Sequence, residues 1–129
     1  MTYKYSLLTH RDDFFNITTQ VRQSIANSGI MEGIAVVFCP HTTAGITINE
    51  NADPDVAYDM LFGLATIFPH SNGYNHAEGN TPSHLKASAI GSSVTIIVEN
   101  GEPLLGKWQG VFFCEFDGPR NRKFYVKVM

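Results

Sequence analysis

Most apolar residues of this chain fall in stretches short enough for β-strands. Residues 2–8 predict a first strand, which could continue through residues 15–17. Residues 33–39 are apolar almost throughout, so we expect both faces of that strand to be covered. Residues 43–49 predict a further strand, with Ile46 and Ile48 on one face.

The last third of the chain also has the spacing of β-structure. The pair Asn100-Gly101 is a typical hairpin turn. Residues 108–116 carry large apolar side chains on both faces, which indicates a strand enclosed between two layers or covered by another subunit. The predicted strands in this part are residues 93–99, 104–105, 108–116 and 123–128.

A first helix is predicted between the first two strand regions. Thr18 suits its N-cap, Val21 and Ile25 share one face, and Gly29 suits its end. The apolar spacing also permits an earlier start near Asp13.

A second helix follows Asp53, which can cap it, and Pro54, which suits its first position. A polar, turn-rich loop over residues 70–81 comes next, and loops of this length are usually functional or disordered. Thr81-Pro82 then begins a short third helix that ends at Gly91. The apolar stripe of the second helix is formed by Val56, Met60, Leu64 and Ile67.

The order of these elements predicts an α+β fold. We expect a small β-sandwich core of about seven strands with two to three helices, in a single domain over residues 1–129. Charged residues make up only 16% of the chain, which suggests that a subunit covers part of its surface.

Charge and hydropathy argue against several partners. The formal net charge is -3 and no run of Lys or Arg occurs, so we expect no nucleic-acid partner. No apolar stretch approaches the roughly 20 residues that span a bilayer, and no signal-peptide core is present, so we expect a cytoplasmic protein without a membrane contact. Cys39 and Cys114 lie in apolar runs and are interpreted as buried free thiols.

Three of the five histidines are candidates for a metal site. His41 follows a predicted strand, His76 lies in the polar loop, and His84 lies in the first turn of the third helix. Imidazole suits zinc and other transition metals, and three such ligands leave a fourth position for water or substrate. Cys39, two residues before His41, is an alternative further ligand. Spacing alone also permits the ordinary reading of scattered surface histidines, and His10 and His70 have only that reading.

Other residues could serve such a site. Glu78 and Glu50 are candidates for a general base or for orienting the imidazole rings. The amides at the start of the third helix, around Asn80 and Thr81, could hold an anionic oxygen such as a phosphate. Arg120, with Arg122, could also grip a phosphate, although a solvated hairpin turn explains the run from residue 117 to 122 equally simply.

The chain resembles the YjbQ family over essentially its whole length. The matching segments are His41-Thr42-Thr43-Ala44-Gly45, Asn49-Glu50-Asn51-Ala52-Asp53-Pro54, His76 to Asn80, His84-Leu85-Lys86-Ala87-Ser88, Gly106-Lys107-Trp108-Gln109-Gly110 and Glu115-Phe116-Asp117-Gly118-Pro119-Arg120. The resemblance implies a trimer around a threefold axis and a divalent metal held by three histidines, which fall here on His41, His76 and His84. Lys107 departs from the threonine expected before the tryptophan.

Three functions follow as expectations. The resemblance implies a secondary thiamine-phosphate synthase, which joins a pyrimidine pyrophosphate to a thiazole phosphate. Such reactions usually use magnesium, whereas histidine ligands favour zinc, so this activity is expected to be weak or secondary. The alternatives are a zinc-type hydrolase or lyase acting on a small phosphorylated substrate, and a non-catalytic trimer that binds a metal or ligand.

Overall fold

The computed structural model describes all 129 residues. It contains eight strands and three helices, which confirms the predicted α+β class. The chain order is β1 (Thr2–Thr9), β2 (Asp13–Asn16), α1 (Thr18–Ser28), β3 (Gly33–Phe38), β4 (Ala44–Glu50), α2 (Pro54–Ile67), α3 (Thr81–Ile90), β5 (Ser93–Glu99), β6 (Glu102–Pro103), β7 (Gln109–Glu115) and β8 (Arg120–Val128).

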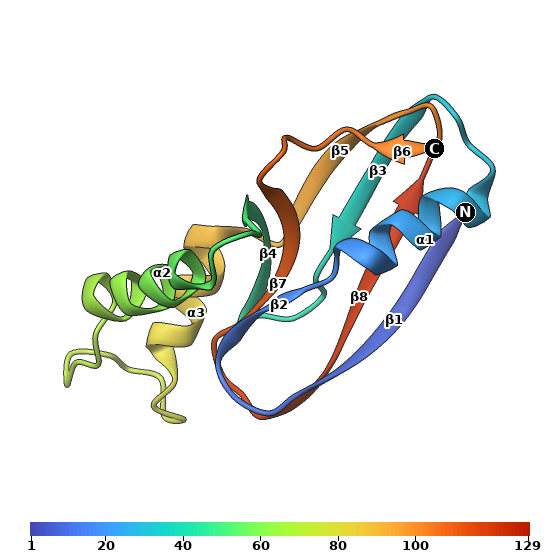
Figure 1. The fold of residues 1–129 in the computed structure, drawn as a ribbon. Helices are drawn as coiled ribbons and strands as arrows, with labels where there is room; N and C mark the ends of the chain where they lie inside the picture. Colours follow the sequence, from blue (N-terminus) through green and yellow to red (C-terminus); the bar gives the residue numbers. More distant parts are fainter.

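The strands form two antiparallel sheets. The five-stranded sheet has the order β1-β8-β3-β5-β6, and the three-stranded sheet has the order β2-β7-β4. The chain changes sheet at every connection except the one between β5 and β6, so the two sheets curl around a shared interior (Figure 1). This arrangement corresponds to the sandwich expected from the sequence.

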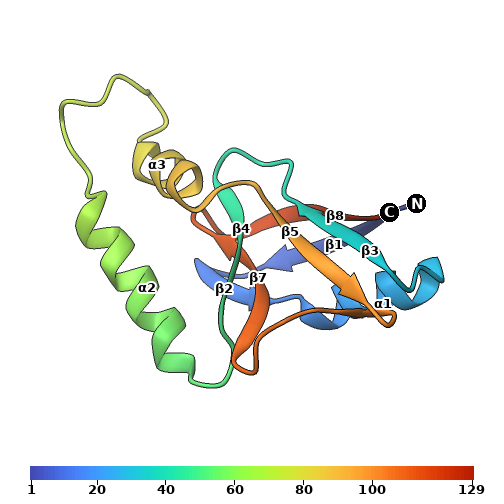
Figure 2. The same ribbon diagram turned by 90° about the horizontal axis from the view of Figure 1, so that it is seen from above.

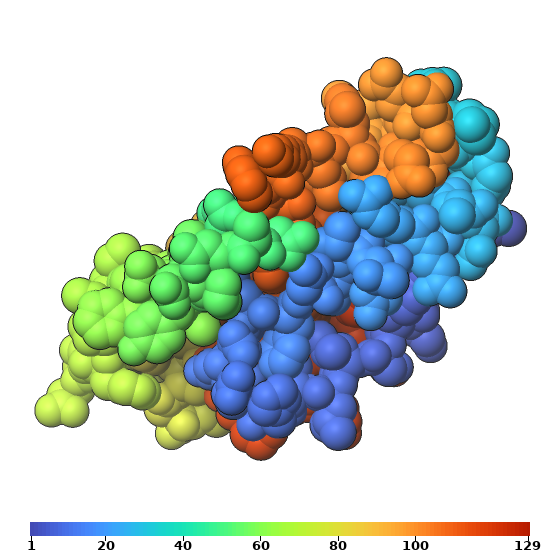
Figure 3. All heavy atoms as spheres, viewed as in Figure 1, coloured from blue at the N-terminus to red at the C-terminus, as the bar shows by residue number.

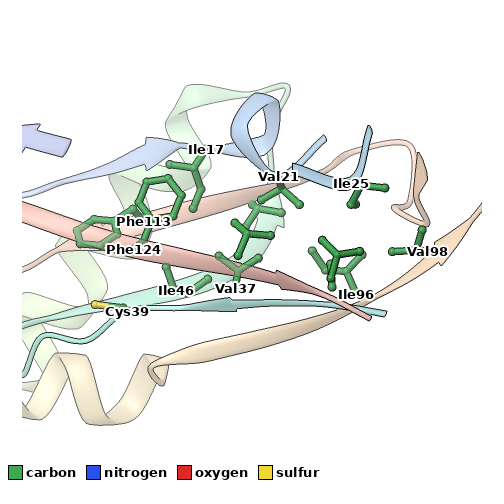
Figure 4. Close-up of a cluster of buried hydrophobic side chains, with 14 of the residues drawn as sticks. Ile17, Val21, Ile25, Val37, Cys39, Ile46, Ile96, Val98, Phe113 and Phe124 are labelled. Atoms are coloured by element: carbon green, nitrogen blue, oxygen red, sulfur yellow. The ribbon is translucent and has the colours of Figure 1, made fainter. Parts of the chain in front are cut away.

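The main core lies between the two sheets and α1. Ile17, Val21 and Ile25 point from the region of α1 toward the sheets, where Phe113 and Phe124 lie with their rings 6.1 Å apart (Figure 4). Thr18 holds α1 in place, because its hydroxyl accepts a hydrogen bond from the Val111 amide at 2.9 Å. Alternation of apolar residues in the strands therefore builds one continuous interior.

The helices α2 and α3 lie on the outer side of the three-stranded sheet, away from α1 (Figure 2). They cover a smaller apolar cluster built on Phe14, Phe112 and Phe116. Asp53 caps α2 by accepting a hydrogen bond from the Asp55 amide at 2.9 Å, as predicted. No residue of α2 is fully buried, so this helix is attached to the rest of the fold by one side only. None of the three helices is long and apolar enough to cross a lipid bilayer.

Several predicted boundaries are wrong. Residues 13–16 form β2, so α1 does not begin near Asp13, and its N-cap is Ile17 rather than Thr18. Residues 104–105 are not a strand, because pairing with β5 ends at Pro103. Ile67 is 67% exposed and does not join the apolar side of α2. These features depend on contacts between segments that are distant in the sequence, and the local pattern of apolar residues carries no information about such contacts.

The expectation that both faces of β3 are covered is also wrong for one chain. Ala35 and Val37 are fully buried, whereas Ile34 and Phe38 on the opposite face are 37% and 42% exposed. By contrast, the double burial predicted for residues 108–116 is confirmed from Gly110 to Phe116, where every residue is buried, but it is wrong for Trp108, which precedes β7 and is 56% exposed.

Candidate functional site

The polar loop after α2 brings two of the predicted histidines together. His76 lies in this loop and His84 in the first turns of α3, whose start is fixed by Pro82. Their ring centroids are 5.3 Å apart and the ring planes are nearly perpendicular, at 85°. A zinc ion about 2.0–2.1 Å from one nitrogen of each ring, in tetrahedral geometry, would hold the centroids roughly 5.2 Å apart. The observed spacing of the ring centroids matches this value.

His41 shares a hollow with His84, and His76 lines a different one. The hollow of His41 and His84 is also lined by Thr42, Ala87 and Ser88. The Nε2 atom of His41 accepts a hydrogen bond from the Lys123 amide at 2.9 Å, so the proton of the neutral ring is on Nδ1. In this arrangement the Nε2 atom of His41 is engaged by the Lys123 amide, and no three His, Cys, Asp or Glu side chains converge within the chain.

The environment of His41 favours the neutral ring. Burial lowers the pKa of His41, and the positive charge of Arg122 lowers it further, against a smaller opposing effect of Glu115. The imidazole therefore presents an N–H donor through Nδ1 near neutral pH.

The start of α3 carries polar atoms without partners. The Oδ1 atom of Asn80 and the Oγ1 atom of Thr81 are buried and form no hydrogen bond. Buried polar atoms normally have partners, so both atoms can accept a hydrogen bond from a water molecule or a bound group. Thr81 lines a second hollow with His76 and Gly79. The predicted binding residues Asn80 and Thr81 thus lie next to the histidine pair.

Asp117 joins Asn80 to Arg120. Its Oδ2 atom accepts hydrogen bonds from the Asn80 side-chain amide at 2.9 Å and from the Arg120 guanidinium at 3.0 Å. Arg120 is half exposed, so its remaining N–H groups face solvent. Asp117 was not among the residues predicted for the site. Its position three residues before Arg120 in the sequence was the signal that could have identified it as the partner of that arginine.

The two predicted carboxylates lie apart. Glu78 is an exposed residue of the turn after His76 and forms no hydrogen bond. Glu50 ends β4 and lines a different cleft, which none of the three histidines borders. Glu78 is the nearer of the two to the histidine pair in sequence, but it lines neither of the hollows that His76 and His84 border.

Arg122 is not available for a phosphate, in contrast to the sequence-based hypothesis. It is 6% exposed and forms an ion pair with Glu115, which is fully buried. Cys39 and Cys114 are buried free thiols, as predicted. Burial raises the pKa of Cys39, which therefore stays a thiol, and its Sγ atom lies 3.9 Å from the His41 carbonyl oxygen.

Comparisons with known proteins agree over the full chain. The family described as UPF0047 protein YjbQ-like matches residues 3–129. The UPF0047 protein YugU of Bacillus subtilis is 52% identical over 94% of this chain and 92% of its own. The UPF0047 protein MJ1081 of Methanocaldococcus jannaschii is 50% identical over 100% of this chain and 94% of its own.

Solved structures give the same result. The crystal structure of an uncharacterized conserved protein from Clostridium acetobutylicum, described as of the YjbQ/UPF0047 family, is 57% identical. It superposes with a TM-score of 0.96 over 98% of this chain and 99% of that chain. A protein of unknown function from Sulfolobus solfataricus, at 31% identity, gives a TM-score of 0.95 over 99% of this chain and 95% of that chain. The chain belongs to the UPF0047 family of YjbQ-like proteins.

Proposed function

We propose that the protein is a metal-dependent enzyme acting on a small phosphorylated substrate at the start of α3. The observation that carries this proposal is the 5.3 Å spacing of the His76 and His84 rings, beside the unpartnered polar atoms of Asn80 and Thr81. Nitrogen ligands favour zinc over magnesium, which prefers oxygen ligands. A bound zinc ion would act as a Lewis acid toward a substrate oxygen.

The surrounding residues supply the remaining tasks. The free amides of the first turn of α3, with Thr81 and Arg120, hold the phosphate oxygens. His41 donates a hydrogen bond through Nδ1, since its Nε2 atom already accepts one from Lys123. Glu78 accepts a proton, because it is the carboxylate on the histidine loop. This assignment departs from the three-histidine set and leaves His76 and His84 as the ligands from the chain.

The test is metal content and turnover of three variants. The purified protein should contain about one zinc-like metal per chain, and His84→Ala should lose it because one of two ligands is gone. His41→Gln, which keeps a hydrogen-bonding side chain, should retain the metal but lose turnover by about tenfold or more. His70→Ala, an exposed histidine outside the pair, is the control.

Turnover is measured as release of phosphate from a panel of phosphoesters and as formation of thiamine phosphate from its two precursors. Loss of the metal in His41→Gln would show that His41 is a third ligand, beside His76 and His84. No metal in the wild-type protein would overturn the proposal, and metal without turnover on either assay would reduce it to a binding protein.

We also propose that the chain assembles as a trimer through the outer face of the five-stranded sheet. Two cross-strand pairs form an apolar strip on this face, namely Ile34 with Ile97 and Phe38 with Tyr125. Ile97 is 57% exposed in the single chain, and exposed apolar strips of this kind usually mark interfaces. Burial of the strip by two other copies would cover the second face of β3.

Ile97→Lys should therefore dissociate the assembly, because it places a charge within the buried strip. Light scattering after size exclusion should give three times the 14.3 kDa mass of one chain for the wild-type protein and a single chain for the variant. Met31→Lys, at an equally exposed apolar residue outside the strip, is the control. A monomeric wild-type protein would contradict the trimer.

A further inference from the structure

A second cleft, separate from the histidines, lies between α2 and the three-stranded sheet. Its volume is about 990 Å³, which is in the range of small-molecule sites. Phe14, Phe112 and Phe116 form its floor, and Tyr58 and Phe62 of α2 form one wall. The green residues of α2 and the blue residues around β2 meet on the face drawn in Figure 3.

The way α2 packs leaves this cleft open. The side of the helix with Met60 and Leu64 packs on the aromatic cluster. Tyr58 and Phe62 stand on the adjoining side and are 68% and 67% exposed. Two exposed aromatic rings on one flank of a helix give an apolar surface that a ligand body can cover, whereas Phe14, Phe112 and Phe116 beneath the helix are at most 8% exposed.

The cleft is strongly acidic. Five of the twelve acidic residues of the chain border it, against two basic residues, which gives a local formal charge of 2 − 5 = −3. One of the two basic residues, Arg11, is already paired with Asp13 at 3.1 Å. The acidic residues are Asp12, Asp13, Glu50, Asp53 and Asp55, and the basic residues are Arg11 and Lys86.

Backbone hydrogen bonds hold three of these carboxylates in place without neutralising them. The Gly118 amide donates to Asp12 at 2.7 Å, and the Ala52 amide donates to Glu50 at 2.9 Å. Asp53 accepts from the Asp55 amide as the cap of α2. Each carboxylate keeps one oxygen outside these bonds, so fixed negative charge lines the same cleft as the exposed rings of Tyr58 and Phe62 before any ligand arrives.

We propose that this cleft binds a small organic cation, an amine or ammonium group attached to an apolar body. The apolar body packs against the exposed rings of Tyr58 and Phe62, and the cationic group is attracted both to the carboxylates and to the faces of these two rings. A neutral ligand of the same size would lack both of these electrostatic attractions, and an anionic ligand would be repelled by the carboxylates. The cleft is thus a site distinct from the anion site at α3.

The test compares benzylammonium with benzyl alcohol, which has a similar shape and no charge. We expect benzylammonium to bind at least about tenfold more tightly by calorimetry and to shift the NMR signals of cleft residues. The isosteric variants Asp12→Asn and Glu50→Gln should each weaken benzylammonium by about fivefold, and added salt should weaken it as well. Asp59→Asn removes the same charge from α2 outside the cleft and should leave binding unchanged.

Equal binding of the charged and neutral probes would overturn the proposal, as would equal losses in Glu50→Gln and Asp59→Asn. A second copy of the chain could cover the same flank of α2 instead. In that case Phe62→Ala would lower the assembly mass and benzylammonium would shift no cleft signal, which would also overturn it.

Discussion

Replacing Arg122 with methionine is expected to lower the free energy of unfolding by about 3–5 kcal/mol, because the change leaves a carboxylate buried without its charge partner. The Arg122 guanidinium donates to Glu115 through Nε at 2.7 Å and to the Thr43 hydroxyl through Nη2 at 2.8 Å. The Thr9 hydroxyl donates to the same carboxylate at 2.7 Å. Urea unfolding at pH 7 measures the loss.

A surface pair of the same chemistry supplies the control. Arg22 donates to Glu102 at 2.7 Å, but the two side chains are 49% and 64% exposed. Arg22→Met should therefore change the free energy of unfolding by no more than about 1 kcal/mol. Losses of equal size in Arg122→Met and Arg22→Met would contradict the importance of burial.

The dependence on pH separates charge from packing. Burial alone would raise the pKa of Glu115, but hydrogen bonds from Arg122, Thr9 and the Asp117 amide lower it overall. This group therefore stabilises the wild-type protein above its unfolded pKa of about 4.3, and that stability is lost as the pH falls through its lower folded value.

In Arg122→Met the sign is expected to reverse, because burial then dominates and raises the pKa of Glu115. The cost of the substitution should shrink as the pH is lowered from 7 to 4, since the carboxyl group becomes neutral in the folded variant. A constant difference between the two proteins across that range would show that lost packing, not charge, causes the destabilisation.

The parts of the fold that could be predicted are those specified locally. Asp53 and Pro54 specify the start of α2 within a few residues, and Gly29 ends α1 at a positive φ of 70°. The same kind of local argument gave a wrong prediction for Arg122, which was expected in a solvated turn and is buried. Its buried position depends on the passage of the chain from β7 to β8 between the two sheets, and on the pairing of β4 with β7, which places Thr43 beside Glu115.

The candidate site divides in the same way. His76 and His84 are eight residues apart, so a folded-back loop was sufficient to predict their proximity. His41 and Lys123 are 82 positions apart, and only the finished fold reveals that the Lys123 amide occupies the His41 Nε2 atom. The unpartnered atoms of Asn80 and Thr81 likewise depend on burial that no sequence pattern specifies.

Gly45→Ala is expected to disturb the histidine pair from a distance, by pushing α3 away from β4. A Cβ atom at this position would lie 2.6 Å from the Gly91 carbonyl oxygen, and that oxygen accepts a hydrogen bond from the Ile46 amide at 3.0 Å. Because the obstructing atom belongs to the backbone, the end of α3 must move and this hydrogen bond must weaken. We expect a loss of about 2–4 kcal/mol in the free energy of unfolding and a roughly tenfold lower affinity for zinc.

Gly63→Ala is the matched control for this substitution. Gly63 lies inside α2, and a Cβ atom there meets nothing within 4 Å. Alanine should therefore raise the free energy of unfolding by about 0.5–1 kcal/mol and leave zinc affinity unchanged. If Gly45→Ala destabilised the protein but bound zinc as tightly as the wild type, the position of α3 on β4 would not control the spacing of His76 and His84, and the loop alone would have to set it.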